Sequence, residues 1–453
     1  MKKSVLIVIG GMLLTAMTAT AQQEDTRCWS LRQCIDYALE NNITLQQAKL
    51  KRQSATEDLK GAKGAQLPTL SASTNQSVGF RPWTESGVAT VTNGQVNTEV
   101  KKTYYNGSYA MNAQWTVWNG NKKTNTVKQN RLAESEAELA EQETANSIQE
   151  SITQLFTQIL YQDEKVKVCQ QTLETARKNE DRGREMVEVG KMSKADLAQL
   201  TAQRATDEYN VVEAQGQLAS YKLQLKQLLE LTDDQPFDIA IPEISDDEVL
   251  AEVPALNSVY EQALLSRPEI EASQLAIKRS DISLAIAKAG WMPTLSMTGG
   301  IGTSSNSLNS NSWGKQIKTS FDATAGLSLS IPIYDGRQTK TQVNKAKIQQ
   351  LSARLSLLDE QKTLYSDIQR FWLNAQTNQQ KYQAAKASVA SEQESFDLLQ
   401  EQFRLGLKNI VELMTGKDKL LSAQQSMLQS KYTALYNEQM LWFYQGQEIK
   451  IGY

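Results

Sequence analysis

Few side chains in this chain of 453 residues could perform catalysis or hold a metal, because the sequence contains no histidine. Imidazole is therefore absent as a general base, as the partner of a serine or cysteine nucleophile, and as a metal ligand. Cys28, Cys34 and Cys169 form no CxxC pair and are too few for a structural zinc site. Carboxylates alone could still support hydrolysis, but the sequence indicates no inward-facing pair. We therefore expect no enzyme, no cofactor and no resident metal.

The amino terminus has the features of a secretory signal. Two lysines precede an apolar run at residues 5–14, and Ala19-Thr20-Ala21 is an A-x-A cleavage site. Residues 1–21 are expected to be removed, so that the mature chain begins near Gln22. Removal takes away two lysines, and 48 minus 2 leaves 46 basic against 51 acidic residues, a net charge of −5. Neither nucleic acid nor an anionic membrane surface is then an obvious partner.

Cys28 and Cys34 allow three interpretations. An oxidising compartment would let them form a disulfide, and two separate thiols near a helix start are an equally good alternative. Lipidation of Cys28 is less favoured, because Asp25-Thr26-Arg27 lacks the small and apolar residues of such a processing site.

The chain contains an internal duplication. Residues 62–71 recur as residues 287–296, an offset of 225, whereas Gly120 with Gly336 and Gly190 with Gly406 are 216 apart. The first copy is thus nine residues longer between Ser71 and Trp118 (225 minus 216). We divide the chain into a first repeat at residues 22–231, an extended or irregular linker at 232–254, and a second repeat at 255–453.

Each repeat is predicted to run as helix, strand, loop, strand, very long helix, break and helix. Strong helix formers dominate the helical segments, and Pro268 marks a first turn or a local break. A helix of about 70 residues would be about 105 Å long and needs partners along its whole length. The expected helices are residues 30–66, 120–189, 194–231, 255–292, 336–405 and 410–447.

Four segments alternate with a period of two. Residues 105–117 and 321–333 carry apolar or aromatic side chains on one face and small polar ones on the other, and residues 68–80 and 293–303 do so more weakly. A sheet with one wet face gives the same alternation. The segments are, however, long enough to cross a bilayer, and the signal, the duplication and the long helices favour a membrane barrel.

Four strands cannot close a barrel, whereas three copies would supply twelve, so we expect a trimer with cyclic symmetry. The predicted fold class is an α+β membrane protein. Long helices form a coiled-coil barrel, and a transmembrane β-barrel takes four strands from each protomer. The polar loops at residues 82–102 and 303–318 should face the cell exterior.

These features resemble the TolC-like outer membrane efflux proteins over nearly the whole chain after the signal. The resemblance rests on motifs that occur twice in the same order: Leu67-Pro68-Thr69-Leu70 with Met292-Pro293-Thr294-Leu295, and Trp118-x-Gly120 with Tyr334-x-Gly336. Ser266-Arg267-Pro268-Glu269-Ile270 adds to it. The family implies a trimeric channel in outer-membrane lipid, continuous with a helical tunnel across the periplasm. Its partners would be a periplasmic adaptor and an inner-membrane transporter, and its cargo drugs, toxins, metals or proteins.

The resemblance also implies sites at the two breaks between long helices. The turns that contact the adaptor fall on Gly190, Lys191, Met192 and Ser193, and on Gly406, Leu407, Lys408 and Asn409. A gate near the second turn falls on Asp196, Phe403, Lys408 and Glu412, and the chain departs from the family at Thr415, where a second acidic position would lie.

Two simpler alternatives remain. The turn glycines would cap any helical hairpin, and the gate charges would be solvated at any hairpin end. A periplasmic coiled-coil scaffold or adhesion protein without a pore would explain the helices equally well. It would not explain four strands with apolar faces at duplicated positions.

Overall fold

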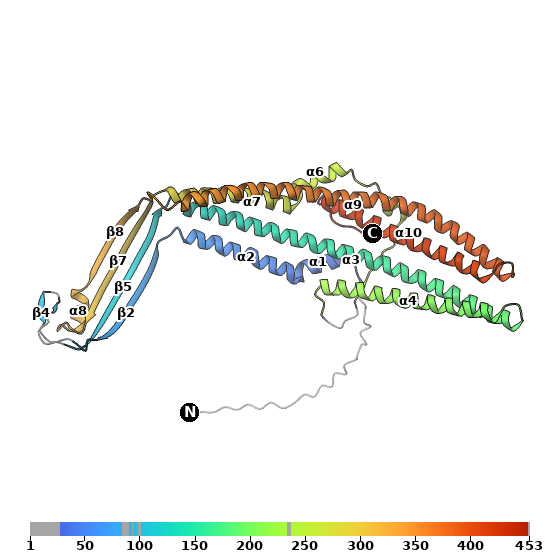
Figure 1. Ribbon diagram of the computed structural model, residues 1–453, viewed down its shortest axis with the longest axis horizontal. Coiled ribbons are helices and arrows are strands. Elements are labelled where there is room, and N and C mark those ends of the chain that lie inside the picture. The colour runs from blue at the N-terminus through green and yellow to red at the C-terminus, as the bar shows by residue number, and fades with distance from the viewer. Residues whose placement is uncertain (1–27, 84–89, 93, 98–100, 233–236, 452–453) are drawn as a thin grey trace, which may run out of the picture.

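The computed structural model describes residues 28–83, 90–92, 94–97, 101–232 and 237–451. The molecule is elongated, with a β-sheet at one end and the turns of two long helical hairpins at the other (Figure 1). The predicted signal at residues 1–21 and the predicted mature start at Gln22 lie outside the described residues.

The main sheet has four antiparallel strands in the order β2-β5-β7-β8. The first repeat supplies β2 and β5 and the second supplies β7 and β8, so the pairing of β5 with β7 joins the two copies. The register places apolar side chains together, because Ala72, Met111, Ile301 and Ala323 lie opposite one another across all four strands. The strands are β2 (Thr69–Phe80), β5 (Thr103–Trp118), β7 (Thr294–Asn306) and β8 (Asp322–Ser330).

The predicted strand at residues 321–333 is too long at its end. β8 stops at Ser330, two residues before Pro332, which has no amide hydrogen to give to a ladder. The two outer loops also contain structure that the sequence analysis missed. A small hairpin, β3 (Thr90–Thr92) with β4 (Gln95–Asn97), lies in the first loop, and the short helix α8 (Trp313–Thr319) lies in the second.

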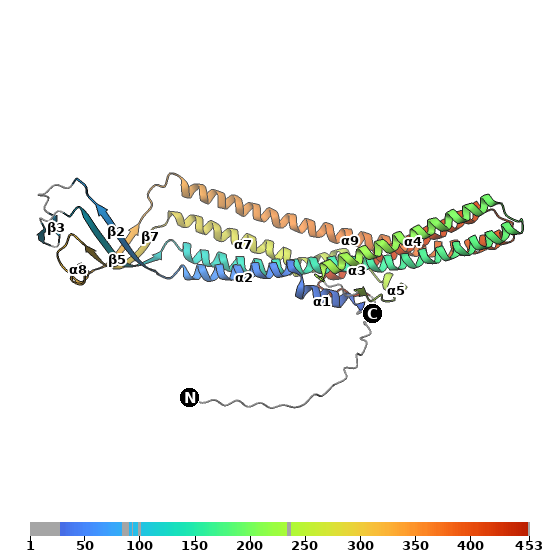
Figure 2. The ribbon, with the colours of Figure 1, turned by 90° about the horizontal axis from the view of Figure 1, so that it is seen from below.

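Four helices run side by side next to the sheet and keep the order of its strands (Figure 2). They are α2 (Ile43–Gly64), α3 (Lys122–Glu188), α7 (Pro268–Lys288) and α9 (Gln338–Arg404). Helix α3 contacts both α2 and α7, and α7 contacts α9. Both α3 and α9 have 67 residues, which corresponds to about 100 Å.

Beyond the ends of α2 and α7, the long helices pair with α4 (Lys194–Leu228) and α10 (Ile410–Tyr444). Helix α3 packs on α4, and α9 packs on α10. A buried ion pair joins the two hairpins, because Lys417 Nζ on α10 lies 2.8 and 2.9 Å from the carboxylate oxygens of Asp207 on α4. The hairpins therefore form one body rather than two separate arms.

The first helical segment of each repeat is divided in the structure, and the prediction of one continuous helix at residues 30–66 is wrong. Residues 30–66 contain α1 (Leu31–Asn41) and α2, separated by Asn42. The side-chain oxygen Oδ1 of Asn42 accepts hydrogen bonds from the Thr44 and Leu45 amides at 2.9 and 3.2 Å and so caps α2. Residues 255–292 contain α6 (Leu256–Ser266), α7 and a terminal 3₁₀ turn, η1 (Ala289–Trp291). The local break predicted at Pro268 is confirmed, since this residue begins α7.

The linker is more ordered than expected. Strand β6 (Asp238–Ile239) pairs in parallel with β1 (Cys28–Trp29), and the short helix α5 (Asp246–Val249) follows it. Cys28 and Cys34 are free thiols. Cys34 is buried on α1, and this burial raises the pKa of its thiol to about 12.

At equivalent positions, the two hairpins are stabilised by different kinds of side-chain interaction. On α3 the buried carboxylate of Glu180 forms an ion pair with Arg204 Nε at 2.7 Å. It also accepts hydrogen bonds from Arg184 Nη2 at 2.8 Å and from the Thr201 hydroxyl at 3.0 Å. The residues 216 positions later than Glu180 and Arg204 are Phe396 and Leu420, which lie in one apolar cluster. An ion pair in one repeat thus replaces an apolar contact in the other.

The first prediction concerns the acid stability of the α3–α4 hairpin. The hydrogen bond from Arg184 holds the pKa of Glu180 below its ordinary value of 4.5. The ionised form therefore stabilises the fold above pH 4.5, and this stabilisation is lost as the pH falls through the lowered pKa. Thermal unfolding should show wild type losing more stability between about pH 5 and 3 than the pair Glu180→Phe with Arg204→Leu, which copies the second hairpin. Equal acid sensitivity of the two proteins would contradict the assignment.

A glycine and a leucine exchange places between the two hairpins. A Cβ atom on Gly183 would lie 2.5 Å from Leu200 Cδ1, and one on Gly416 would lie 2.6 Å from Leu399 Cδ1. Leu399 is 216 residues after Gly183, and Gly416 is 216 residues after Leu200. In both hairpins a glycine facing a leucine lets the two helices approach closely. The leucine lies on α4 in the first hairpin and on α9 in the second.

The second prediction tests this close approach. Gly183→Leu should destabilise the protein by about 1–3 kcal/mol through overpacking against buried Leu200, and adding Leu200→Gly should recover most of the loss. Gly216→Ala is the control, because nothing lies within 4 Å of its added Cβ; it should be neutral or stabilise by about 0.5–1 kcal/mol. Chemical denaturation of wild type, Gly183→Leu, Leu200→Gly, the double variant and the control measures the coupling, and additivity of the two changes at positions 183 and 200 would refute it.

Candidate functional site at the helical tip

The two turns at the end of the molecule remote from the sheet have the same backbone geometry (Figure 1). Gly190 and Gly406 adopt left-handed φ values of 72° and 76°. In the first turn Lys191 N donates to Met186 O at 2.7 Å and Gly190 N donates to Val187 O at 3.0 Å. The second turn repeats these bonds at 2.9 and 3.0 Å, from Leu407 N to Gln402 O and from Gly406 N to Phe403 O. This double closure is the Schellman motif, in which glycine at the left-handed position costs no strain.

The helices that follow the turns begin with matching caps. The side chains of Ser193 and Asn409 accept hydrogen bonds from the amides of Asp196 and Glu412 at 3.1 and 2.9 Å. Asp196 and Glu412 are therefore the third residues of α4 and α10, where the helix dipole favours a carboxylate. Both predicted gate acids thus have a structural reason for their position that is independent of a gate.

The four predicted gate residues have different surroundings. Phe403 is only 5% exposed and packs in an apolar cluster with Leu200, Ile410 and Leu413. Lys408 forms an ion pair with Glu412, and both side chains are about 40% exposed. Asp196 lies in the other turn and accepts a hydrogen bond from the Ser193 hydroxyl at 2.8 Å. The structure thus brings Phe403, Lys408 and Glu412 together in one turn, and their role in a gate stays a prediction.

The tip carries apolar side chains that are mostly exposed in the protomer. Val189, Leu405 and Leu407 are 67%, 61% and 71% exposed, and Val411 at the start of α10 is 60% exposed. The sequence analysis placed Leu407 in an adaptor-contacting turn but did not single out the other three side chains as exposed apolar groups. The signal available in the sequence was an apolar residue on each side of a turn glycine, where solvated turns usually carry polar residues. Exposed apolar groups gathered at one place suit contact with another protein.

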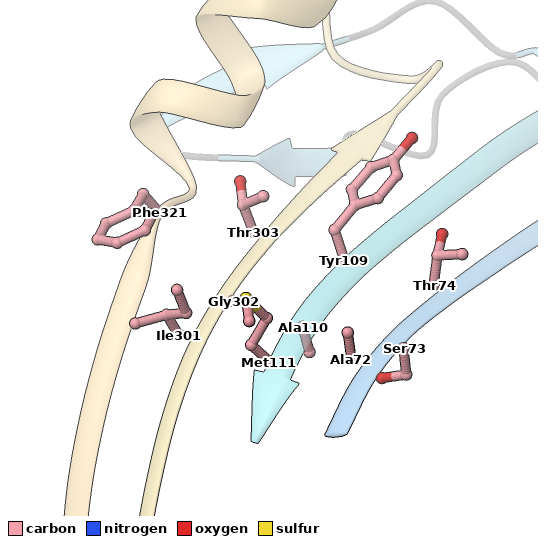
Figure 3. Close-up of a pocket in the computed structure, with 10 residues that line it drawn as sticks. All are labelled: Ala72, Ser73, Thr74, Tyr109, Ala110, Met111, Ile301, Gly302, Thr303 and Phe321. Carbon is pink, nitrogen blue, oxygen red and sulfur yellow. The ribbon is translucent and has the colours of Figure 1, made fainter. Parts of the chain in front are cut away.

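The sheet end carries a second set of exposed apolar side chains. A hollow of about 380 Å³ lies on its apolar face, where side chains of β2, β5 and β7 meet Phe321 at the start of the fourth strand (Figure 3). It is lined by Ala72, Ser73, Thr74, Tyr109, Ala110, Met111, Ile301, Gly302, Thr303 and Phe321.

None of the helices in the described part of the chain has both the length and the hydropathy needed to cross a membrane. Within the same residues, no group of three or more cysteine or carboxylate side chains is arranged to hold a metal ion.

Comparison with known proteins identifies relatives of this chain. It is 25% identical over 276 residues to the probable efflux pump outer membrane protein TtgC of Pseudomonas putida, a match that spans 60% of the chain and 54% of TtgC. It is 21% identical to the outer membrane efflux protein BepC of Brucella suis biovar 1, over 94% of the chain and 86% of BepC. The chain thus spans about half the length of the first of these relatives and most of the second.

A solved structure with the same fold is the CmeC outer membrane channel of Campylobacter jejuni. It superposes with a TM-score of 0.76 at 19% identity, over 93% of this chain and 87% of CmeC. The family model for outer membrane efflux proteins matches residues 34–230 and 259–447, which include both helical hairpins and all four strands of the main sheet. The chain therefore belongs to the outer membrane efflux protein family.

Proposed function

We propose that this chain is the outer-membrane channel of an export system, with its sheet in the membrane and its helices forming a tunnel in the periplasm. The observation that carries the proposal is the sheet at one end of the molecule. It is apolar on one face, and within the described residues β2 and β8 each pair on one side only. Such open edges are resolved when copies of the chain complete a barrel.

Three copies are the number we favour. Four strands per protomer then give twelve, and fewer than about eight strands do not form a membrane barrel. Two copies would give the minimum of eight strands, whose interior is filled by side chains, whereas twelve strands leave room for passage.

We further propose that the chain consists of two duplicated halves, residues 22–231 and 255–453. Each half supplies two neighbouring strands of the protomer's four-stranded sheet.

The apolar face of the sheet suits contact with lipid. Leu70, Leu327 and Leu329 are 71%, 71% and 60% exposed on this face, as expected of side chains that meet hydrocarbon in the assembled barrel. Aromatic residues lie toward both ends of the strands, as is typical where a protein meets the two membrane surfaces. They are Trp115, Trp118, Trp291 and Tyr334 at the helical end, and Phe80, Tyr105, Tyr109 and Trp313 at the outer end.

The partners we propose are a periplasmic adaptor and an inner-membrane transporter. The relative TtgC is named an efflux pump protein, and the exposed apolar tip of this chain supports docking of another protein there. A scaffold without a pore is the weaker alternative, because it gives no role to an in-register sheet with one apolar face.

The third prediction tests the channel and its gate together. Purified chain added to a planar lipid bilayer should give discrete conductance steps, and absence of any conductance would refute the channel. If three copies of Glu412 face the axis, Glu412→Ala should lower cation selectivity and weaken block by divalent cations. Lys408→Gln removes the counter-charge of Glu412 and should raise cation selectivity. Asp196→Ala is the comparison, and unchanged selectivity in both variants at positions 408 and 412 would remove this pair from the gate.

The fourth prediction tests docking at the tip. Leu407→Asp should abolish export, because burying an unpaired carboxylate in a protein interface costs several kcal/mol. Leu407 follows the left-handed Gly406, so the change leaves the turn geometry intact. Leu265→Asp is the control, since Leu265 on α6 is 90% exposed but lies far from the tip. Export assays in cells, with the outer-membrane level of each variant measured, should separate the two; normal export by Leu407→Asp would exclude this docking surface.

A further inference from the structure

The outer end of the sheet carries a rigid, positively charged element. Helix α8 is held to the end of β7 by Gln316, which is buried and donates to Asn311 O at 2.7 Å while its side-chain oxygen accepts from Asn306 N at 2.7 Å. The Thr303 hydroxyl donates to Ile317 O at 2.6 Å. Trp313 meets the ring of Tyr109 edge to face, with centroids 6.3 Å apart. These contacts hold the helix against the end of the sheet.

Two lysines of this helix have no acidic partner within the described residues. Lys315 and Lys318 are three residues apart, so they share one side of α8, and both are exposed. Among the described residues no carboxylate forms an ion pair with either of them. Lys101 lies at the same end, where its ammonium donates to Ser307 O at 3.3 Å. Asp322, the first residue of β8, pairs in register with Gly302 on the polar face of the sheet, opposite to the face that Tyr109 and Ile301 occupy.

An apolar groove starts next to α8, because Thr303, whose hydroxyl donates to Ile317 O of this helix, lines its upper end. The groove runs along the strands. The hollow of about 380 Å³ in Figure 3 shares Met111 and Ile301 with a second hollow of about 410 Å³ farther down the same face. Small residues make the space, because Ala72, Ala113, Gly299 and Ala325 leave gaps between the larger side chains. The groove is open to the surroundings along its length, in the direction that an acyl chain takes in a bilayer.

We propose that this rim is a binding site for an anionic, phosphorylated membrane lipid. The headgroup phosphate lies at Lys315 and Lys318, and an acyl chain lies in the groove past Met111 and Ile301. This inference rests on the proposed membrane position of the sheet. The charge and the shape of the site together select the occupant. A soluble phosphate would contact the lysines but would not fill the groove, and a neutral lipid would fill the groove but would not pair with the lysines. The net negative charge of the chain does not oppose binding, because the local charge on α8 is positive.

The test is a lipid titration of the full-length chain in a nonionic detergent, with bound lipid counted by native mass spectrometry. Wild type should bind phosphatidylglycerol more tightly than phosphatidylcholine with the same acyl chains. Each lysine near a membrane surface contributes about a fivefold preference for anionic lipid, so Lys315→Gln with Lys318→Gln should lower the affinity for phosphatidylglycerol about 25-fold. Lys362→Gln with Lys381→Gln removes the same charge from exposed positions on α9 and should change nothing.

A second variant tests the groove separately from the charge. Ala72→Phe fills the upper hollow and should weaken phosphatidylglycerol binding, while leaving the weak binding of glycerol phosphate, which has no acyl chain, unchanged. Equal affinity for the two lipids, equal loss in the α9 control, or glycerol phosphate binding as tightly as the lipid would overturn the proposal. Conductance of the same preparation in a planar bilayer separates the test of the lipid site from the test of the channel. A conducting channel without lipid preference refutes this site alone. A chain that neither conducts nor binds lipid refutes the proposed function.

Discussion

A sheet that crosses a bilayer must pair every backbone amide and carbonyl, because hydrocarbon offers no hydrogen-bonding partner and each unpaired group costs several kcal/mol. In this protomer β5 and β7 are paired on both sides, whereas β2 and β8 each keep an open edge within the described residues. The proposed closure of the sheet by neighbouring copies therefore also sets the arrangement of the helices. The helices α2, α3, α7 and α9 follow the strands in the same order, so a closed ring of strands places the helices in a ring as well. A tunnel is then the geometric consequence of a barrel.

The duplication keeps backbone geometry more strictly than side-chain chemistry. Left-handed residues recur at Gly120 and Gly336, at Gly190 and Gly406, and at Glu230 and Gly446, all 216 positions apart. Packing is less strict: the ion pair of Glu180 with Arg204 corresponds to an apolar contact of Phe396 with Leu420. Either solution fills the space between two helices, because a well-packed apolar pair and a fully hydrogen-bonded ion pair have similar net stability. Helix ends have no such freedom, since only a narrow range of φ and ψ closes a Schellman motif.

Most of the fold followed from periodicity and repetition, which are properties of long segments. The four strands and the long helices were placed to within a few residues, and the turn glycines were identified correctly. The misses were local features that depend on tertiary contacts. The break at Asn42 occurs where its side-chain amide meets the Leu228 carbonyl at 3.0 Å, 186 residues away, and no local pattern indicates this contact. The pairing of β1 with β6 and the fold of α8 around Gln316 are of the same kind. The gate residues came from family resemblance alone, and the capping role of Asp196 and Glu412 became visible only with the backbone.

Structural and functional roles can be separated at the tip. Gly190 and Gly406 close the ends of α3 and α9, and Ser193 and Asn409 cap α4 and α10, so backbone and caps account for the turns completely. Asp196 and Glu412 stabilise helix starts whether or not they face a pore. Val189, Leu405 and Leu407 do neither: their side chains cap nothing and are more than half exposed. Apolar side chains gathered at the end of a long hairpin suit contact with another protein. The docking role that we propose for the tip therefore falls on the side chains beside the glycines rather than on the glycines themselves.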